Sequence, residues 1–163
     1  MKTHFPYKLA VVFLLIINFN CFCSISTMEQ SILGEFNLLL SSEKKVLRNL
    51  STNTIKSHTA NLFSTYGYVD TVSFLVYITD KDDEFKSLTS QNIPAWVVGV
   101  AKGNKIVIKS PKQKSMTYDN FNKILKHEIS HLYLSQINNK FPSWFNEGFA
   151  MYNAHEFNTD RKV

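Results

Sequence analysis

Cysteine is nearly absent from this chain of 163 residues, and its placement limits the chemistry available. The only two cysteines, Cys21 and Cys23, lie near the amino terminus. The rest of the chain therefore has no disulfide framework and no cysteine nucleophile, and a metal site there must use nitrogen and oxygen ligands. Neither cysteine follows the aliphatic-then-small pattern of a lipoprotein signal, which argues against lipidation.

The amino-terminal apolar run is too short for a membrane-spanning helix. It covers residues 9–17, whereas a spanning helix needs about 20 apolar residues. Lys2 and Lys8 flank its start and Asn18 ends it, which is typical of a secretory signal peptide. We expect a signal peptide over residues 1–26, with processing between about Cys23 and Thr27. The protein would be secreted, periplasmic or held in the cell envelope; an uncleaved membrane anchor is the alternative.

The chain also lacks a strong charge imbalance. Its formal charge is +5, and without Lys2 and Lys8 sixteen basic residues face thirteen acidic ones. Lysines do cluster at 102–114, but no aromatic residues alternate with them, and lysine often protects an exposed strand edge. We therefore expect no nucleic-acid partner. Nothing in the sequence indicates an oligomeric state.

No repeat, low-complexity tract or linker divides the remaining chain, which predicts a single domain over residues 27–163. The apolar spacing of residues 28–66 predicts helix, broken near 51–53. A strand is expected at 71–79, a short helix after 80–83, and a β-hairpin from strands 96–101 and 105–110. The fold class expected is α+β, with a small mixed or antiparallel sheet and the metal site within residues 71–158.

The most informative motif is His127-Glu128-Ile129-Ser130-His131. Histidines four residues apart lie on one face of a helix, so both rings can reach one metal ion while Glu128 stands beside them. The apolar residues around the motif indicate a buried helix. Two core histidines bound to backbone carbonyls are the alternative, but that reading explains neither Glu128 nor the acidic residue downstream.

The downstream acid is Glu147, which we expect to be the third ligand. Pro142 ends any preceding helix, and Ser143 is expected to cap a second helix that carries Glu147 back beside the first. Gly148 and Ala150 are small, which would let the two helices approach closely. Glu147 alone would also suit the positive end of a helix dipole.

Together these motifs resemble the gluzincin metallopeptidases, and specifically the peptidase MA-like group, in which an HExxH helix precedes a Pro-x-Trp-Phe-x-Glu-Gly-x-Ala stretch. The likeness extends over residues 72–157 and implies a zincin-like fold, with the hairpin packed on the zinc-binding helices. It implies one Zn²⁺ bound by His127, His131 and Glu147. It also implies that Glu128 is the general base for a zinc-activated water.

A peptide substrate could bind by adding a strand to the edge of the sheet. The resemblance favours the strand at Ile106, Val107 and Ile108 for this role, whereas the residues alone allow a plain edge protected by Lys105 and Lys109.

The resemblance also raises the question of a tyrosine or histidine that stabilises the oxyanion. Tyr152 and His155 are the only residues of these types after Glu147. Their positions along a helix put neither on the face of Glu147, so we expect neither to act directly.

Three functions are open from the sequence. The first is an exported zinc-dependent peptidase that cleaves peptides or proteins. The second is a catalytically weak zinc-binding module that recognises peptides or envelope partners. The third is a structural envelope domain in which the motif arose by chance. Zinc content separates the third from the others, and turnover separates the first from the second.

Overall fold

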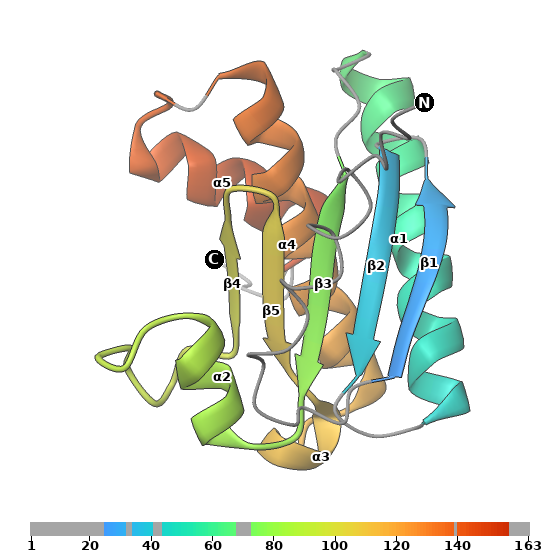
Figure 1. Ribbon diagram of the computed structural model, residues 1–163. Coiled ribbons are helices and arrows are strands. Elements are labelled where there is room, and N and C mark those ends of the chain that lie inside the picture. Colours follow the sequence, from blue (N-terminus) through green and yellow to red (C-terminus); the bar gives the residue numbers. More distant parts are fainter. Residues whose placement is uncertain (1–24, 32–33, 41–43, 68–72, 139, 157–163) are drawn as a thin grey trace, which may run out of the picture.

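A computed structural model describes residues 25–31, 34–40, 44–67, 73–138 and 140–156. It contains one five-stranded sheet with helices on both faces, as Figure 1 shows. The elements in chain order are β1 (Ile25–Ser31), β2 (Gly34–Leu40), α1 (Lys45–Tyr66), β3 (Phe74–Thr79), α2 (Asp82–Leu88), β4 (Gly99–Lys102), β5 (Lys105–Lys109), α3 (Pro111–Lys114), α4 (Tyr118–Ile137) and α5 (Ser143–Asn153). The α+β class predicted from the sequence is confirmed.

The sheet is mixed, with strand order β1-β2-β3-β5-β4. The β1–β2 and β4–β5 pairs are antiparallel, and β3 runs parallel to both β2 and β5. Alternate residues of β2, β3 and β5 point to one face, where they form the core with α1 and α4. The other face carries Lys105 and Lys109, whose ammonium groups contact α2 at the Leu88 carbonyl and at Asp82.

The predicted helix over residues 28–66 is wrong in its first part. Residues 25–31 and 34–40 form the β1–β2 hairpin, in which Phe36, Leu38 and Leu40 are buried and the residues between them are more exposed. This alternation of buried and exposed residues is the pattern of a strand. The segment also fitted the spacing of a helix, because Leu39 adds a further apolar residue between Leu38 and Leu40. The predicted break near 51–53 is also wrong, because α1 is continuous and Ser51 Oγ donates to the Leu47 carbonyl within it.

The strand suggested as a substrate edge is not at an edge. Ile106, Val107 and Ile108 lie in β5, which is paired with β3 on one side and β4 on the other. Its backbone groups are therefore used within the sheet. Lys109 does not protect an exposed edge either; it is buried at 2% exposure, forms an ion pair with Asp82 and lies over the Phe85 ring.

The free edge nearest the motif belongs to β4 instead. The hairpin forms as predicted, but its first strand begins at Gly99 rather than Trp96. The residues before it form a turn, in which the Val97 N–H donates to the Pro94 carbonyl. In the described sheet β4 pairs with β5 alone.

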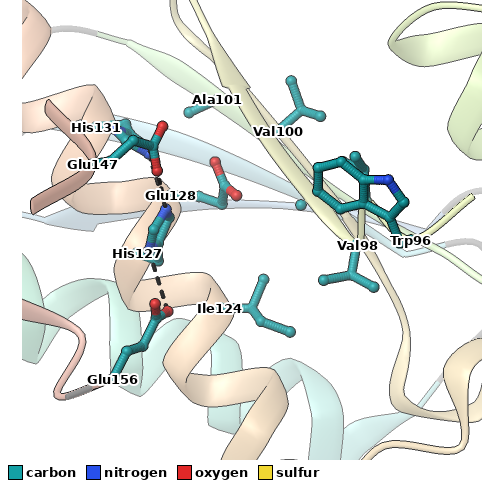
Figure 2. Close-up of a pocket in the computed structure, with 12 residues that line it drawn as sticks. Trp96, Val98, Val100, Ala101, Ile124, His127, Glu128, His131, Glu147 and Glu156 are labelled. Carbon is teal, nitrogen blue, oxygen red and sulfur yellow. Dashed lines mark hydrogen bonds and ion pairs between the residues drawn. The ribbon is translucent and has the colours of Figure 1, made fainter. Parts of the chain in front are cut away.

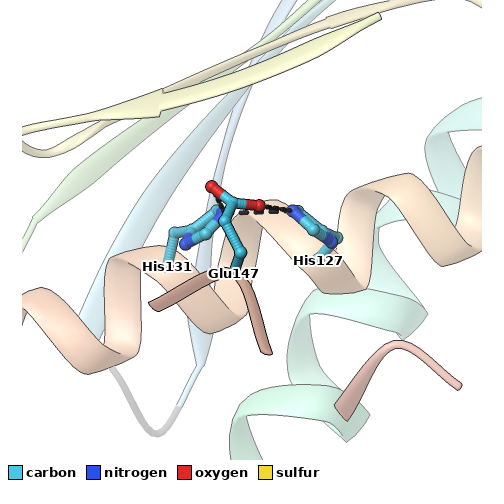
Figure 3. Close-up of side chains that lie close together, drawn as sticks. All are labelled: His127, His131 and Glu147. Carbon is cyan, nitrogen blue, oxygen red and sulfur yellow. Dashed lines mark hydrogen bonds and ion pairs between the residues drawn. The ribbon is translucent and has the colours of Figure 1, made fainter. Parts of the chain in front are cut away.

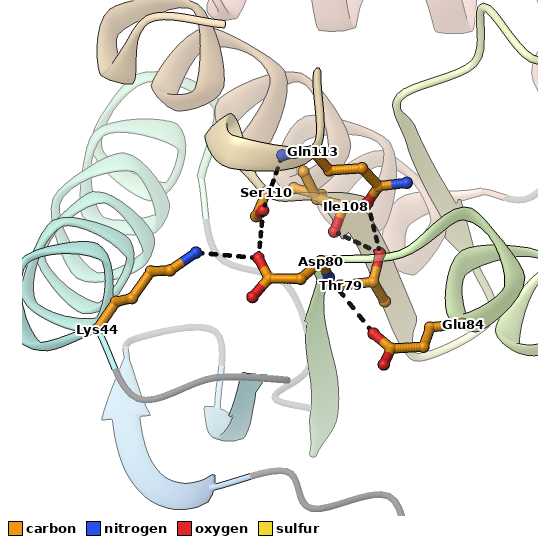
Figure 4. Close-up of polar contacts among 7 residues, drawn as sticks. All are labelled: Lys44, Thr79, Asp80, Glu84, Ile108, Ser110 and Gln113. Carbon is orange, nitrogen blue, oxygen red and sulfur yellow. Dashed lines mark hydrogen bonds and ion pairs between the residues drawn. The ribbon is translucent and has the colours of Figure 1, made fainter. Parts of the chain in front are cut away.

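A polar cluster holds the start of α1 against the ends of β3 and β5 (Figure 4). Asp80, just after β3, accepts hydrogen bonds from Lys44 Nζ at 3.0 Å and from the Ser110 hydroxyl. Ser110 in turn caps α3 by accepting from the Gln113 N–H. These bonds fix the connection from β5 towards α4.

The expected signal peptide lies almost wholly outside the described residues, which begin at Ile25. In the described part of the chain, no helix is both long enough and apolar enough to cross a membrane.

His58 of α1 supports the motif helix from behind. Its Nε2 lies 3.0 Å from Ser130 Oγ, and that hydroxyl donates to the Lys126 carbonyl at 2.8 Å. Ser130 therefore accepts from His58 Nε2–H. Burial, aided by the charge of Lys126, lowers the pKa of His58 to about 4.

This lowered pKa predicts acid sensitivity. The unfolded chain binds the proton below about pH 6.5 but the folded chain only below about pH 4, so the free energy of unfolding falls as pH decreases through that window, by about 3 kcal/mol. We expect His58→Gln to lose correspondingly less stability between pH 7 and pH 4 in urea unfolding. Asn61→Gln, a change at an exposed and uncharged position of the same helix, should retain the wild-type pH dependence. Parallel curves for wild type and His58→Gln would contradict the assignment.

Candidate metal centre

The motif lies on α4, a 20-residue helix with a clear start. The Thr117 side chain accepts from the Asn120 N–H at 3.1 Å and so caps the first turn. The helix is anchored by four fully buried apolar residues at helical spacing: Phe121, Leu125, Ile129 and Leu132. Burial of this stripe fixes the rotation of α4 and leaves His127 and His131 half-buried on another side.

The three expected ligands converge, as Figure 3 shows. The Nε2 atoms of His127 and His131 are 3.0 Å apart. The Glu147 carboxylate lies 3.5 Å from His127 Nε2 through Oε2 and 3.7 Å from His131 Nε2 through Oε1. The structure thus brings together the two histidines predicted from the motif and the acid predicted sixteen residues downstream of His131.

These separations fit a zinc ion. Zn–N and Zn–O bonds of about 2.0 to 2.2 Å at the tetrahedral angle place ligand atoms roughly 3.3 to 3.5 Å apart. The two imidazole nitrogens are 3.0 Å apart, and each has a different Glu147 oxygen at 3.5 or 3.7 Å, close to that value. One ligand atom from each residue lies within 4.8 Å of the other two, so a small movement of the carboxylate would bring a single oxygen to the ion. Burial lowers the pKa of His131, which favours the neutral ring that a metal requires. His127, His131 and Glu147 are therefore the residues that would hold the ion.

Glu147 is supplied by α5, which returns beside α4 as expected but begins differently. Pro142 occupies the N-cap and Ser143 is the first helical residue, without a side-chain capping bond, so the predicted Ser143 cap is wrong. Gly148 does not serve close packing, because a Cβ there would meet nothing within 4 Å. Ala150 is fully buried.

Each histidine has an acceptor side chain close to its outer nitrogen. Asn146 Oδ1 lies 2.9 Å from His131 Nδ1 and accepts its proton, which leaves Nε2 facing the ligand group. Glu156 Oε1 lies 3.2 Å from His127 Nδ1. That approach is close enough for an ion pair but poorly aligned for a hydrogen bond, and the buried Nδ1 has no hydrogen-bond partner among the described residues. Glu156 is therefore the nearest acceptor available to this ring.

The sequence did not reveal these two partners. Asn146 could have been suspected because it directly precedes Glu147. Glu156 could not, because it reaches His127 through a turn after α5. In that turn His155 adopts a left-handed conformation with φ 56°, and the Glu156 N–H bonds to the Met151 carbonyl.

Glu128 is pressed against β4. It is 7% exposed, and the Ala101 backbone N–H donates to its carboxylate. A Cβ at Gly99 would lie 2.5 Å from Glu128 Oε1, so glycine is needed there for this approach. Burial, together with the charges of Glu147 and Glu156, raises the pKa of Glu128 to about 8.

These residues line a pocket of about 520 Å³ between β4 and α4, shown in Figure 2. Its polar side consists of His127, His131 and the carboxyl groups of three glutamates, Glu128, Glu147 and Glu156. In the described part of the chain, no lysine or arginine lines this pocket. The pocket therefore concentrates negative charge around two nitrogen ligands, an arrangement that favours a cation.

The two residues considered for the oxyanion lie elsewhere. Tyr152 is 65% exposed on α5, and His155 is exposed just beyond the helix. Neither lines this pocket. This placement agrees with the expectation that neither acts directly.

The geometry predicts graded losses of zinc affinity. Glu147→Ala removes a ligand and should weaken binding at least a hundredfold; Glu156→Gln removes only the charged partner of His127 and should cost about ten- to a hundredfold. Competition with a chromophoric chelator measures both. Asp83→Ala, which removes an exposed carboxylate on α2, should bind zinc like wild type. Equal affinity of Glu147→Ala and wild type would remove Glu147 from the ligand group.

No protein-family model matches this sequence, and no curated protein matches it. The function of the site must therefore be inferred from the chemistry of its own residues.

Proposed function

We propose that the protein is an exported zinc-dependent peptidase of the gluzincin type, which hydrolyses peptide bonds with a zinc-activated water. The observation that carries this proposal is the convergence of His127, His131 and Glu147 beside the buried carboxyl group of Glu128. Three convergent ligands leave a fourth position of a tetrahedral ion for water, which distinguishes catalytic from structural zinc sites. A bound zinc ion would make that water acidic near neutral pH and polarise the substrate carbonyl.

The free edge of β4 supports a peptide as the substrate. The Lys109 N–H donates to the Val98 carbonyl at 2.9 Å, and hydrogen-bonded pairs alternate along an antiparallel ladder. The N–H and C=O groups of Gly99 and Ala101 therefore point away from β5, on the edge beside the metal-ligand group. The Ala101 N–H already donates to the Glu128 carboxylate. An extended peptide could pair with the two groups of Gly99 and with the Ala101 carbonyl as a sixth strand.

The role proposed for Glu128 is transfer of a proton through its carboxylate. It takes one proton from water as the water oxygen bonds to the carbonyl carbon, and gives it to the amine nitrogen as the C–N bond breaks. A pKa near the working pH suits a group that must both accept and donate. A cation at the ligand group would offset the repulsion from Glu147 and Glu156 and so favour the ionised base.

The other residues of the site hold these groups in place. Asn146 fixes the His131 ring with Nε2 towards the ligand group, and Glu156 lies beside Nδ1 of the His127 ring. Gly99 leaves room for the Glu128 carboxyl group beside the strand.

This mechanism predicts the effect of Glu128→Gln. The amide keeps the shape of the side chain but cannot accept the proton, so peptide hydrolysis should fall by about 10² to 10⁴ while zinc content is unchanged. A fluorogenic peptide library and metal analysis of the purified protein measure the two quantities. Asp83→Asn is the matched control and should retain activity.

Other outcomes identify the remaining alternatives. Zinc binding without turnover in the wild type would favour the peptide-recognition module, for which the absence of Tyr152 and His155 from the pocket is the supporting observation. A protein that does not bind zinc would favour the third alternative, a structural envelope domain.

Export is the second part of the proposal, and its support is the apolar run at residues 9–17 after Lys2 and Lys8. Processing before Ile25 would leave the β1–β2 hairpin whole. We expect amino-terminal sequencing of the mature protein to find a new terminus between about Cys23 and Thr27. An intact Met1 on a membrane-bound product would establish the anchor instead.

A further inference from the structure

The groove beside β4 extends to both sides of the metal-ligand group. The pocket of about 520 Å³ adjoins a second one of about 210 Å³, and both are lined by Ala101, His131 and Glu147. The larger pocket includes Ile124 and His127 from the earlier turns of α4. The smaller one includes Leu132 and Ser135 from the later turns. The groove therefore follows β4 and α4, with the ligand group between its two halves.

Both ends of the groove are formed by exposed residues. Trp96 lies at one end with 80% of its surface exposed, and Gly103 and Ser135 are exposed at the other. Among the residues that the structure describes, no lysine or arginine lines either pocket to hold a terminal carboxylate. Glu156, which could attract a terminal amine, is already beside His127. The groove thus suits a chain that continues beyond it in both directions.

The two halves differ in size and chemistry. The larger pocket presents the indole of Trp96 with Val98 and Ile124, which form an apolar wall opposite the ligand group (Figure 2). An indole this exposed is a large apolar surface without a partner in the described part of the chain, and aromatic surfaces of this kind contribute strongly when a ligand covers them. The smaller pocket, with Gly103, Ser135 and Asn146, has less than half the volume and is more polar.

Strand geometry allows one peptide to use both halves. Side chains two residues apart point to the same side of an extended chain. A peptide paired with the backbone groups of Gly99 and with the Ala101 carbonyl can therefore direct one side chain into each pocket, with the intervening backbone at the ligand group.

On the basis of the peptidase function proposed above, we infer that the site acts on internal bonds of extended protein segments. These segments place a large apolar or aromatic side chain against Trp96 and a small side chain, two residues away, in the pocket at Gly103 and Ser135. Trp96 is then the residue that determines specificity, and the enzyme is an endopeptidase.

A matched pair of tryptophan variants tests this specificity. The substrates are internally quenched peptides blocked at both ends, with Phe, Leu, Ala, Lys or Arg at the varied position. Trp96→Ala should lower kcat/KM at least tenfold for the Phe and Leu peptides and by less than twofold for the Ala peptide. Trp144→Ala, which removes a tryptophan 75% exposed on α5 and outside both pockets, should change neither by more than twofold. Similar effects of the two variants, a preference for Lys or Arg, or a requirement for a free terminus would overturn the inference.

A binding measurement separates this inference from the peptidase function. The chain has two tryptophans, so Trp144→Phe leaves Trp96 as the single tryptophan, whose emission can be excited selectively. In the zinc-loaded Glu128→Gln/Trp144→Phe protein, a blocked Phe-containing peptide should shift the Trp96 emission saturably, whereas its Ala counterpart should require at least tenfold more peptide. This response without cleavage by wild type would refute the peptidase but keep the groove. Cleavage of Phe peptides without any Trp96 response would refute the groove.

Discussion

The close approach of α4 to β4 is the constraint on which the site depends. It is possible because Gly99 has no side chain where the Glu128 carboxyl group meets the strand. The contact buries Glu128, and that burial is the largest cause of its raised pKa. The same contact aligns the edge of β4 with the turn of α4 that bears the histidines. A larger residue at position 99 would separate the acid–base group from the strand that is proposed to hold the substrate.

Negative charge accounts for much of the remaining electrostatics. Glu128, Glu147 and Glu156 share one pocket, and the charges of Glu147 and Glu156 add to the burial that raises the pKa of Glu128. Without a cation the cluster lowers its repulsion by keeping a proton on Glu128, the most buried of the three. A cation held by His127, His131 and Glu147 would offset the repulsion that acts on the neighbouring Glu128.

The sequence predicted the parts of the site that depend on local spacing. His127, Glu128 and His131 lie within two turns of one helix, and Glu147 follows across a short helical hairpin; the structure brings all three expected ligands together. Glu156 escaped prediction because its approach depends on the left-handed turn at His155, for which the sequence gives no glycine signal. The strand order could not be predicted either, because it depends on which distant segments pair. β5 therefore lies inside the sheet and β4 at its edge.

The amino-terminal part shows a different limit. The segment containing Phe36, Leu39 and Leu40 fits both a helical and a strand period over its short length, and pairing with β1 and β3 decides between them. The helix and strand propensities of the residues do not include the stabilisation that comes from pairing with β1 and β3.

The position of the expected ligands on two successive helices has a consequence for how the domain responds to its surroundings. An ion held by His127 and His131 of α4 and by Glu147 of α5 would link the helices across their connecting turn. Because the unfolded chain does not hold these three groups together, free zinc at a thousand times its dissociation constant would add about 4 kcal/mol to the free energy of unfolding. The lifetime of the folded chain, and its resistance to other proteases, would then follow the zinc supply of the compartment it enters.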